Sequence, residues 1–255
     1  MMSTTADVTR HHRSVCVSIV SHGHGSMILP LIRQLLAFNE VAEVIVTHNV
    51  PEDVDIPEDA RIRRVFNQAP RGFGENHNRA FSLSDELYFC VLNPDVRLPL
   101  NPYPRLLAEL EKAEAGLVAP KIVTSTGKVE DSVRTFPTLM RLLLKGLKVD
   151  DGKHRGLRSV SAFSPECVAG MFMLFTQQAF AHVKGFDQRY FLYYEDIDIC
   201  VRLWKAGLRI RAVPSISVVH DAQRDSHRSL RFLTWHTASM LKFLFRHMGR
   251  LPKIT

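Results

Sequence analysis

The stretch that decides the fold is ELYFCVLNPD, which runs from Glu86 to Asp95. After Glu86 it holds six consecutive apolar or aromatic residues, the pattern of a buried strand. Asn-Pro and Pro-Asp are turn dipeptides, so the strand ends at Asn93. An aspartate placed there lies at the carboxyl edge of the sheet, where open α/β sheets bind ligands. The tripeptide is therefore either an ordinary turn or a turn that also presents Asp95 to a ligand.

On both sides of this strand, strand-like and helix-like segments alternate. Strand patterns occupy Ser14–Ser21, Glu43–Thr47, Arg61–Phe66 and Gly116–Val123. Helical spacing of apolar residues marks Met27–Phe38, Gly72–Leu83 and Pro104–Ala115. This alternation predicts an α/β fold with a mostly parallel sheet flanked by helices on both faces. The functional loops should then follow the first, second and fourth strands.

In the second half of the chain the spacing of apolar residues is less regular. Strand patterns cover Val168–Thr176 and Arg209–Val219, and helices are expected at Gln177–Val183, within Asp187–Gly207 and at residues 228–247. We divide the chain into a disordered lead-in (1–13), one α/β domain (14–226) and a C-terminal basic amphipathic helix (227–255). The basic stretch at residues 142–165 is expected to be a mobile loop, with an acceptor-side lid as its functional interpretation.

Composition limits the class of protein. The chain has 255 residues, ordinary apolar and charged fractions, and a net charge of +7. That charge suits a phosphate-rich partner, but no nucleic-acid recognition motif accompanies it, so we expect no nucleic acid. No apolar run approaches the roughly 18 residues of a membrane span. The four cysteines are widely spaced and form no CxxC pair, which favours buried thiols in a cytoplasmic protein.

Residues 191–198, FLYYEDID, are the most informative candidate site. Acidic residues suit the first turn of a helix, which explains the acids but not the aromatic residues before them. A carboxylate beside aromatic rings is desolvated, which raises its pKa and suits it to act as a general base. Asp198 and Arg202 are four residues apart and can pair on one helix face. Glu195 and Asp196 are then free for the site.

Two further patterns have both a structural and a functional interpretation. GFGENHNR, from Gly72 to Arg79, is either a helix start with polar caps or a segment that lets a ligand approach the backbone. His220 ends the last strand and is either a structural histidine or a ligand of a nearby ion.

Taken in order, these segments resemble family 2 of the glycosyltransferases, which have the GT-A fold, and in particular the rhamnosyltransferase-like branch. The resemblance covers roughly residues 15–226. The matching segments are VSIVS (17–21), GFGENHN (72–78), LNPD (92–95), AGMFML (169–174), GFD (185–187), YEDID (194–198) with Arg202-Leu203, and His220 with Ser226.

The resemblance implies a role for each matched residue. Asp95, in the place of the family's Asp-x-Asp signature, would bind a Mg²⁺ or Mn²⁺ ion with His220 as a further ligand. Asp196, or in second place Glu195, would be the catalytic base. The donor, a nucleoside diphosphate sugar with dTDP-L-rhamnose as the first guess, would lie near Ser21, His48, Gly72, Gly74, Asn76, Asn78, Asn93 and Asp95.

Three positions depart from the family pattern. The first signature aspartate is Asn93, a neutral and weaker ligand. His48 stands where the family has an aspartate that binds the pyrimidine base, and Ser21-His22-Gly23-His24 replaces Ser-Tyr-Asn. The identity of the nucleotide therefore stays open.

The expected activity is metal-dependent, inverting transfer of the sugar to a hydroxyl group of a glycan or lipid-linked acceptor. The alternatives are a nucleotidyltransferase and a non-catalytic relative that binds sugar nucleotides. Residues 230–246 mix basic and aromatic residues, so this helix either packs on the domain or lies in a membrane interface. We accordingly expect a cytoplasmic protein, which under the second alternative would also be peripheral at the inner face of the cell membrane.

Overall fold

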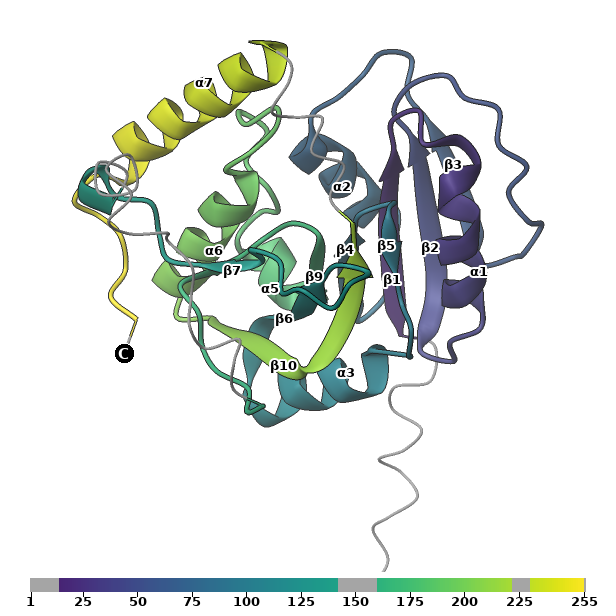
Figure 1. The fold of residues 1–255 in the computed structure, drawn as a ribbon, viewed down its shortest axis with the longest axis horizontal. Helices are drawn as coiled ribbons and strands as arrows, with labels where there is room; N and C mark the ends of the chain where they lie inside the picture. Colours follow the sequence, from purple (N-terminus) through teal and green to yellow (C-terminus); the bar gives the residue numbers. More distant parts are fainter. Residues whose placement is uncertain (1–13, 142–159, 222–229, 255) are drawn as a thin grey trace, which may run out of the picture.

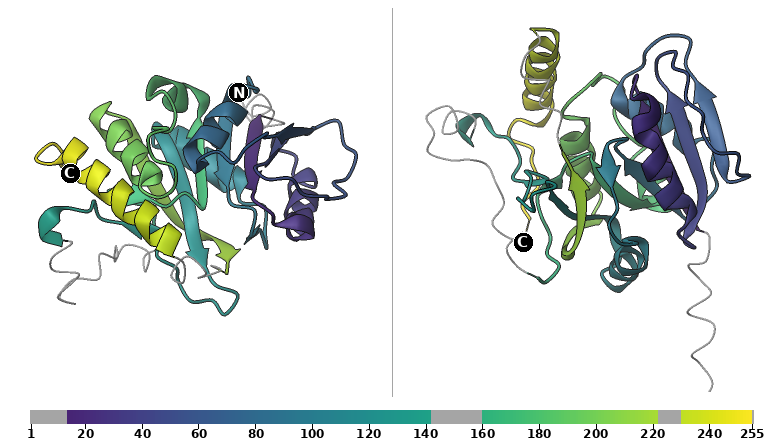
Figure 2. Two further views of the ribbon diagram at one scale, coloured as in Figure 1. Left: turned by 90° about the horizontal axis from the view of Figure 1, so that it is seen from above. Right: turned by 45° about the vertical axis from the view of Figure 1, so that its right-hand side comes forward.

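A computed structural model describes residues 14–141, 160–221 and 230–254 as a mixed eight-stranded sheet with helices on both faces (Figures 1 and 2). The strand order is β3-β2-β1-β4-β9-β6-β10-β5, and β7 and β8 form a separate two-stranded sheet. The expected lead-in (1–13), most of the basic loop (142–159) and Ser226 lie outside the described residues.

The N-terminal half is parallel, as the sequence predicts. Its strands are β1 (Val15–Ser21), β2 (Val41–His48), β3 (Ile62–Phe66) and β4 (Tyr88–Leu92). Strand β1 pairs with β2 on one side and with β4 on the other, both in parallel register. The connecting helices are η1 (Gly25–Ile28), α1 (Leu29–Leu36) and α2 (Phe73–Phe81). The carboxyl ends of these strands therefore meet at one edge of the sheet.

The other half mixes parallel and antiparallel pairs. Strands β6 (Ala115–Val123) and β10 (Arg209–His220) are parallel to each other, and β5 (Val96–Arg97) runs antiparallel to β10. The helices of this half are α3 (Tyr103–Lys112), α5 (Gln177–His182) and α6 (Glu195–Lys205). Because β10 ends beside β5, His220 comes close to the turn that follows β4.

The expectation of one strand across Val168–Thr176 is wrong. The segment forms two strands in different sheets, because β8 (Cys167–Val168) pairs with β7 (Val133–Arg134) while β9 (Phe172–Thr176) enters the main sheet. Strand β9 lies between β4 and β6 and is antiparallel to both. The apolar residues between the two strands carry a strand-like pattern, but they connect the sheets instead of extending either one.

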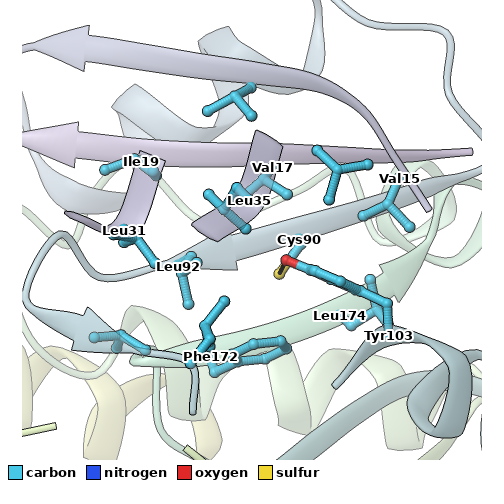
Figure 3. Packing of buried hydrophobic residues seen from close by; sticks show 14 of the residues in the cluster. Val15, Val17, Ile19, Leu31, Leu35, Cys90, Leu92, Tyr103, Phe172 and Leu174 are labelled. Atoms are coloured by element: carbon cyan, nitrogen blue, oxygen red, sulfur yellow. Dashed lines mark hydrogen bonds between the residues drawn. The ribbon is translucent and has the colours of Figure 1, made fainter. Parts of the chain in front are cut away.

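Each face of the sheet has its own apolar core. Alternate residues of β1 (Val15, Val17 and Ile19) pack toward Leu31 and Leu35 of α1 and toward Tyr103 of α3 (Figure 3). Helices α2, α5 and α6 pack on the opposite face of the sheet and bury its apolar side chains. On that face the hydroxyl of Ser18 is hydrogen-bonded to Nδ1 of His77, and burial lowers the pKa of His77 to about 3. His77 is therefore a neutral core residue at neutral pH.

Helix α7 (Leu230–His247) lies on the side of α6 that faces away from the main sheet (Figure 1). It packs on α6 and on the segment before it, rather than directly on the sheet. The predicted pair of Asp198 and Arg202 is confirmed, with Nε of Arg202 2.6 Å from Oδ2 of Asp198. The other carboxylate oxygen, Oδ1, lies 2.8 Å from Nε2 of His247 and so ties the end of α7 to α6.

The expected burial of the cysteines is confirmed, since all four are buried and free. Burial raises the pKa of the Cys16 thiol to about 12, which keeps it protonated. Among the described helices, none has the length and hydropathy needed to cross a bilayer.

Candidate active site

Polar side chains gather where β1, β2, β4 and β10 end. Ser21 and His48 are register partners at the ends of β1 and β2. Asn93 and Asp95 follow β4, and His220 ends β10. Because β1, β2 and β4 pair in parallel, Ser21, His48, Asn93 and Asp95 lie at one edge of the sheet, as the sequence predicts. His220 reaches the same edge because it is the register partner of Val96, which follows Asp95.

Asp95 and His220 form the first part of the site. Nε2 of His220 lies 3.2 Å from Oδ1 of Asp95, and both side chains are largely buried. Oδ1 of Asp95 and Nδ1 of His220 have no hydrogen-bond partner within the described ranges. Carboxylate oxygen and imidazole nitrogen are ligands that Mn²⁺ accepts, and Oδ1 of Asp95 and Nε2 of His220, 3.2 Å apart, are close enough to contact one ion. These two residues therefore fit a divalent ion, although no group of three or more His, Cys, Asp or Glu ligands occurs among residues 14–141, 160–221 and 230–254.

Ser21 and His48 belong to a second cluster, which includes a residue that sequence reasoning missed. Nδ1 of His48 donates to Oε1 of Glu52 at 2.8 Å, and the Gly25 amide donates to Oε2 at 3.0 Å. Burial acts to raise the pKa of Glu52, but hydrogen bonds from Ser21, Gly25 and His48 outweigh it and leave the pKa below its usual value. Glu52 is thus a carboxylate that fixes the orientation and tautomer of His48.

The remaining nitrogen of His48 is unused. The residue is only 1% exposed, and Nε2 has no hydrogen-bond partner among the residues that the structure describes. The ring stacks on Phe66 with 4.7 Å between centroids. Because Nδ1 carries the proton shared with Glu52, a neutral His48 presents a lone pair at Nε2.

The glycine-led segment makes close contacts within the protein. A Cβ atom on Gly72 would lie 2.8 Å from the carbonyl oxygen of Phe191, and one on Gly74 would lie 2.5 Å from Cβ of Phe186. The two glycines thus allow the start of α2 to approach the segment that leads to α6.

Two asparagines of α2 hold backbone groups. Asn78 both donates to and accepts from the backbone of Phe186, each at 2.8 Å. Asn76 is fully buried and donates to the carbonyl oxygens of Arg71 and Gly72. Its Oδ1 accepts from Asn67, which also donates to Asn49. This chain of amides joins the ends of β2 and β3 to the start of α2, and the sequence analysis did not find Asn49 or Asn67.

Glu195 and Asp196 begin α6, and a strained backbone leads to them. Tyr193 and Tyr194 have φ values of 69° and 70°. Bulky residues rarely adopt this left-handed region, at a cost of order 1–3 kcal/mol each. Oδ2 of Asp196 accepts from the Gly170 amide at 3.1 Å, and Oδ1 accepts from the Ile197 amide at 2.8 Å.

The two carboxyl groups differ in environment. Burial and then the charge of Asp196 raise the pKa of Glu195 well above its usual value, and Oε2 of Glu195 lacks a hydrogen-bond partner in the described parts of the chain. Burial also raises the pKa of Asp196, but the charge of Arg134 and the amides of Gly170 and Ile197 oppose that shift. Asp196 is therefore the more readily ionised of the pair. Arg134 is a further nearby residue that the sequence analysis did not single out.

The segment Gly170-Met171 joins the two halves of the site. Its Gly170 amide binds Asp196, and the carbonyl oxygen of Met171 accepts from the Asn93 amide at 3.0 Å. The start of α6 and the turn after β4 are thus held by consecutive residues. Asp196 and the turn that holds Asn93 and Asp95 therefore lie on either side of one short connection.

Comparison with known families gives two matches. Residues 16–177 match the family described as "Glycosyl transferase family 2". Residues 158–226 match the family described as "N-terminal domain of galactosyltransferase".

Comparison with known proteins gives relatives along most of the chain. Rhamnosyltransferase WbbL of Escherichia coli K12 is 30% identical over 245 residues, covering 91% of this chain and 93% of WbbL. The N-acetylglucosaminyl-diphospho-decaprenol L-rhamnosyltransferase of Mycobacterium tuberculosis H37Rv is 29% identical over 219 residues, covering 74% of this chain and 68% of that protein.

Solved structures share the architecture at low sequence identity. GalNAc-T7, crystallised with UDP, GalNAc and Mn²⁺, has a TM-score of 0.63 at 14% identity, over 82% of this chain and 43% of its own. TarS 1-349 of S. aureus has a TM-score of 0.56 at 11% identity, over 91% of this chain and 65% of its own. The chain thus spans less than half the length of GalNAc-T7, and these matches support the GT-A fold alone.

Proposed function

The chain belongs to glycosyl transferase family 2, and from this premise we propose that it transfers L-rhamnose from a nucleoside diphosphate sugar to a hydroxyl group of a glycan or lipid-linked acceptor. The first-choice donor is dTDP-L-rhamnose. The observation that carries the proposal is the Gly170-Met171 connection, which holds Asp196 on one side and the Asn93–Asp95 turn on the other.

In this reaction Asp196 is the general base. Its carboxylate removes the proton of the acceptor hydroxyl group as the oxygen attacks the anomeric carbon. The bond between that carbon and the diphosphate oxygen breaks, and the nucleoside diphosphate leaves. Attack opposite the leaving group inverts the anomeric configuration. General-base catalysis of this kind contributes roughly 10²–10⁴-fold.

Asp95 and His220 would hold a divalent ion, Mg²⁺ or Mn²⁺, with Asn93 beside them. When bound, the ion neutralises the charge that develops on the departing diphosphate. This assignment is supported by the 3.2 Å approach of Nε2 of His220 to Oδ1 of Asp95, an oxygen that is buried without a hydrogen bond among the described residues.

We assign the nucleotide base to Ser21, His48 and Glu52. Uracil and thymine carry a proton on N3, and the lone pair on Nε2 of His48 can accept it. Cytosine carries a lone pair at N3 instead, so the same nitrogen does not match it. Thymidine and uridine donors are therefore favoured over cytidine donors. The glycine-led start of α2, with Gly72, Gly74, Asn76 and Asn78, shapes the wall between this base site and the carboxylates.

The outer face of α7 is the membrane contact at the inner face of the cell membrane. Leu233, Leu241 and Phe245 are exposed and lie multiples of four residues apart, so they share one side of the helix. We call them the outer stripe. Lys242, Arg250 and Lys253 lie in the same part of the chain and add the positive charge that anionic lipid attracts.

A donor screen tests the function. Purified protein is heated with thymidine, uridine, cytidine and guanosine diphosphate sugars, with and without Mn²⁺. A thymidine or uridine donor at ~100 times its Kd should stabilise the fold by about 2.7 kcal/mol. Product from a glycan or lipid-linked acceptor should have the inverted anomeric configuration. Donor binding without any product would indicate a non-catalytic relative, and no donor response would refute the proposal.

A further inference from the structure

Helix α7 contacts every residue of the strained segment that precedes the two carboxylates. The ring of Phe191 packs on Trp235 with 4.8 Å between centroids. The carbonyl oxygen of Leu192 accepts from Oγ of Ser239 at 2.9 Å. Tyr193 and Tyr194 each meet the ring of His236 at 5.4 Å, and Tyr194 also packs on Phe243.

The opposite side of the same segment rests on the start of α2. The Phe73 amide donates to the carbonyl oxygen of Phe191 at 2.9 Å. Gly72 faces the same carbonyl group, and a Cβ atom there would collide with it. Residues 191–194 are therefore held between α2 and α7, with little room to move toward α2.

This confinement explains how two successive tyrosines keep a left-handed backbone. Bulky residues keep positive φ values only where the surrounding structure over-determines them. Tyr194 caps α6 without a side-chain hydrogen bond to that helix, so the cap itself does not fix its conformation. Ring contacts with His236 and Phe243 of α7 add to the backbone bond that its carbonyl oxygen accepts from Asp198.

We propose that α7 is a positioning element of the active site and that Ser239 is its principal positioning residue. Ser239 is 4% exposed and binds a backbone atom three residues before Glu195. Through that bond it sets the direction in which the chain enters α6, and so the direction of Glu195 and Asp196. The rate measurement in the test rests on the proposed function, whereas the NMR measurement does not need the protein to transfer a sugar.

The test compares Ser239→Ala with Thr237→Ala, which removes a hydroxyl group from the exposed side of the same helix. Rates are measured with a soluble acceptor, and donor Kd by calorimetry. Ser239→Ala should lower kcat by about tenfold, because small displacements of a catalytic group cost large factors in rate. Donor Kd should stay within twofold, and Thr237→Ala should match the unmodified chain. Ser239→Thr keeps the hydroxyl group and should retain most of kcat.

A second measurement does not need turnover. The Gly170 amide binds Asp196, so its NMR resonance reports where that carboxylate lies. It should shift in Ser239→Ala and stay in place in Thr237→Ala. If Ser239→Ala does not fold, Trp235→Phe weakens the neighbouring contact with Phe191 and should give the same pattern.

Two results would overturn the proposal: an unchanged kcat with an unmoved Gly170 resonance, or equal losses of kcat and donor affinity. An unmodified chain that transfers no sugar would refute the proposed function, while the Gly170 resonance would still decide the role of Ser239.

Discussion

Nε2 of His220 lies 3.2 Å from Oδ1 of Asp95, although the two residues are 125 positions apart in the chain (220 minus 95). If this pair holds the divalent ion, Asp95→Ala should abolish metal-dependent donor binding and lower turnover by at least about 10²-fold. Asp55→Ala, at an exposed aspartate in the loop after β2, is the matched control. The measurement is donor Kd and rate with Mn²⁺, after EDTA, and after Mn²⁺ is restored. Full activity in EDTA would rule out the metal mechanism.

The His48–Glu52 pair makes a prediction about the nucleotide. Glu52→Gln removes the carboxylate that fixes the tautomer of His48, so uridine and thymidine diphosphates should bind about tenfold more weakly, the equivalent of one hydrogen bond. His48→Asp alone would place two carboxylates side by side. The double change His48→Asp with Glu52→Gln avoids that repulsion and should sharpen the preference for thymidine and uridine donors. Calorimetry with four nucleoside diphosphates checks this, and an unaltered profile would place His48 away from the base.

The general base is tested by removing its basicity without changing its shape. Asp196→Asn should lower kcat by about 10²-fold or more and leave donor Kd nearly unchanged. Glu195→Gln is the matched comparison on the neighbouring carboxyl group. Steady-state kinetics and calorimetry on the same samples separate the two effects. If Glu195→Gln is inactive while Asp196→Asn keeps the normal rate, the base is Glu195.

Arg134 makes the pH dependence testable. Asp196 works only when ionised, so kcat should fall as pH drops through its pKa. Burial raises that pKa, while Arg134 is the largest opposing influence. Arg134→Gln should therefore raise the pKa further and move the acidic limb of the kcat profile to higher pH. Arg63→Gln, at a half-exposed surface arginine, is the control and should leave the limb in place.

The outer stripe of α7 makes a prediction about membranes. Leu241→Glu and Phe245→Glu place charge on the exposed side of the helix and should reduce co-sedimentation with anionic vesicles by about tenfold or more. Leu100→Glu changes a residue that is even more exposed but lies far along the chain from α7. It should bind vesicles like the unmodified chain. Absence of vesicle binding by the unmodified chain at low salt would remove the membrane proposal.

The parallel half of the fold could be predicted because its signals are local. The strand after Glu86 is an uninterrupted apolar run, and the strand after Ser14 is apolar up to Val20 apart from Ser18. The pairing of Asp198 with Arg202 follows from helical spacing. Placement of Asp95 at the sheet edge follows from one strand and one turn. These inferences need no knowledge of distant segments.

The remaining features depend on contacts between distant segments. Glu52 is an ordinary loop acid in the sequence, and only the fold shows that Ser21, Gly25 and His48 surround it. Gly170 continues an apolar run, so nothing local shows that its amide binds Asp196 or that the strand breaks there. The basic, aromatic sequence of α7 predicts an amphipathic helix, but not which segment its inner face covers.

The place of β9 in the sheet affects how the chain folds. During synthesis, β4 and β6 emerge before the strand that joins them, so both keep an open edge until Thr176 has been made. Such late, long-range pairing raises the contact order and slows folding. A nascent chain or fragment that stops before Phe172 leaves one edge of β4 and both edges of β6 unpaired and is prone to aggregate. The natural minimal folding unit therefore extends past β9, and a split of this protein into separately produced halves should avoid the interval between β4 and β9.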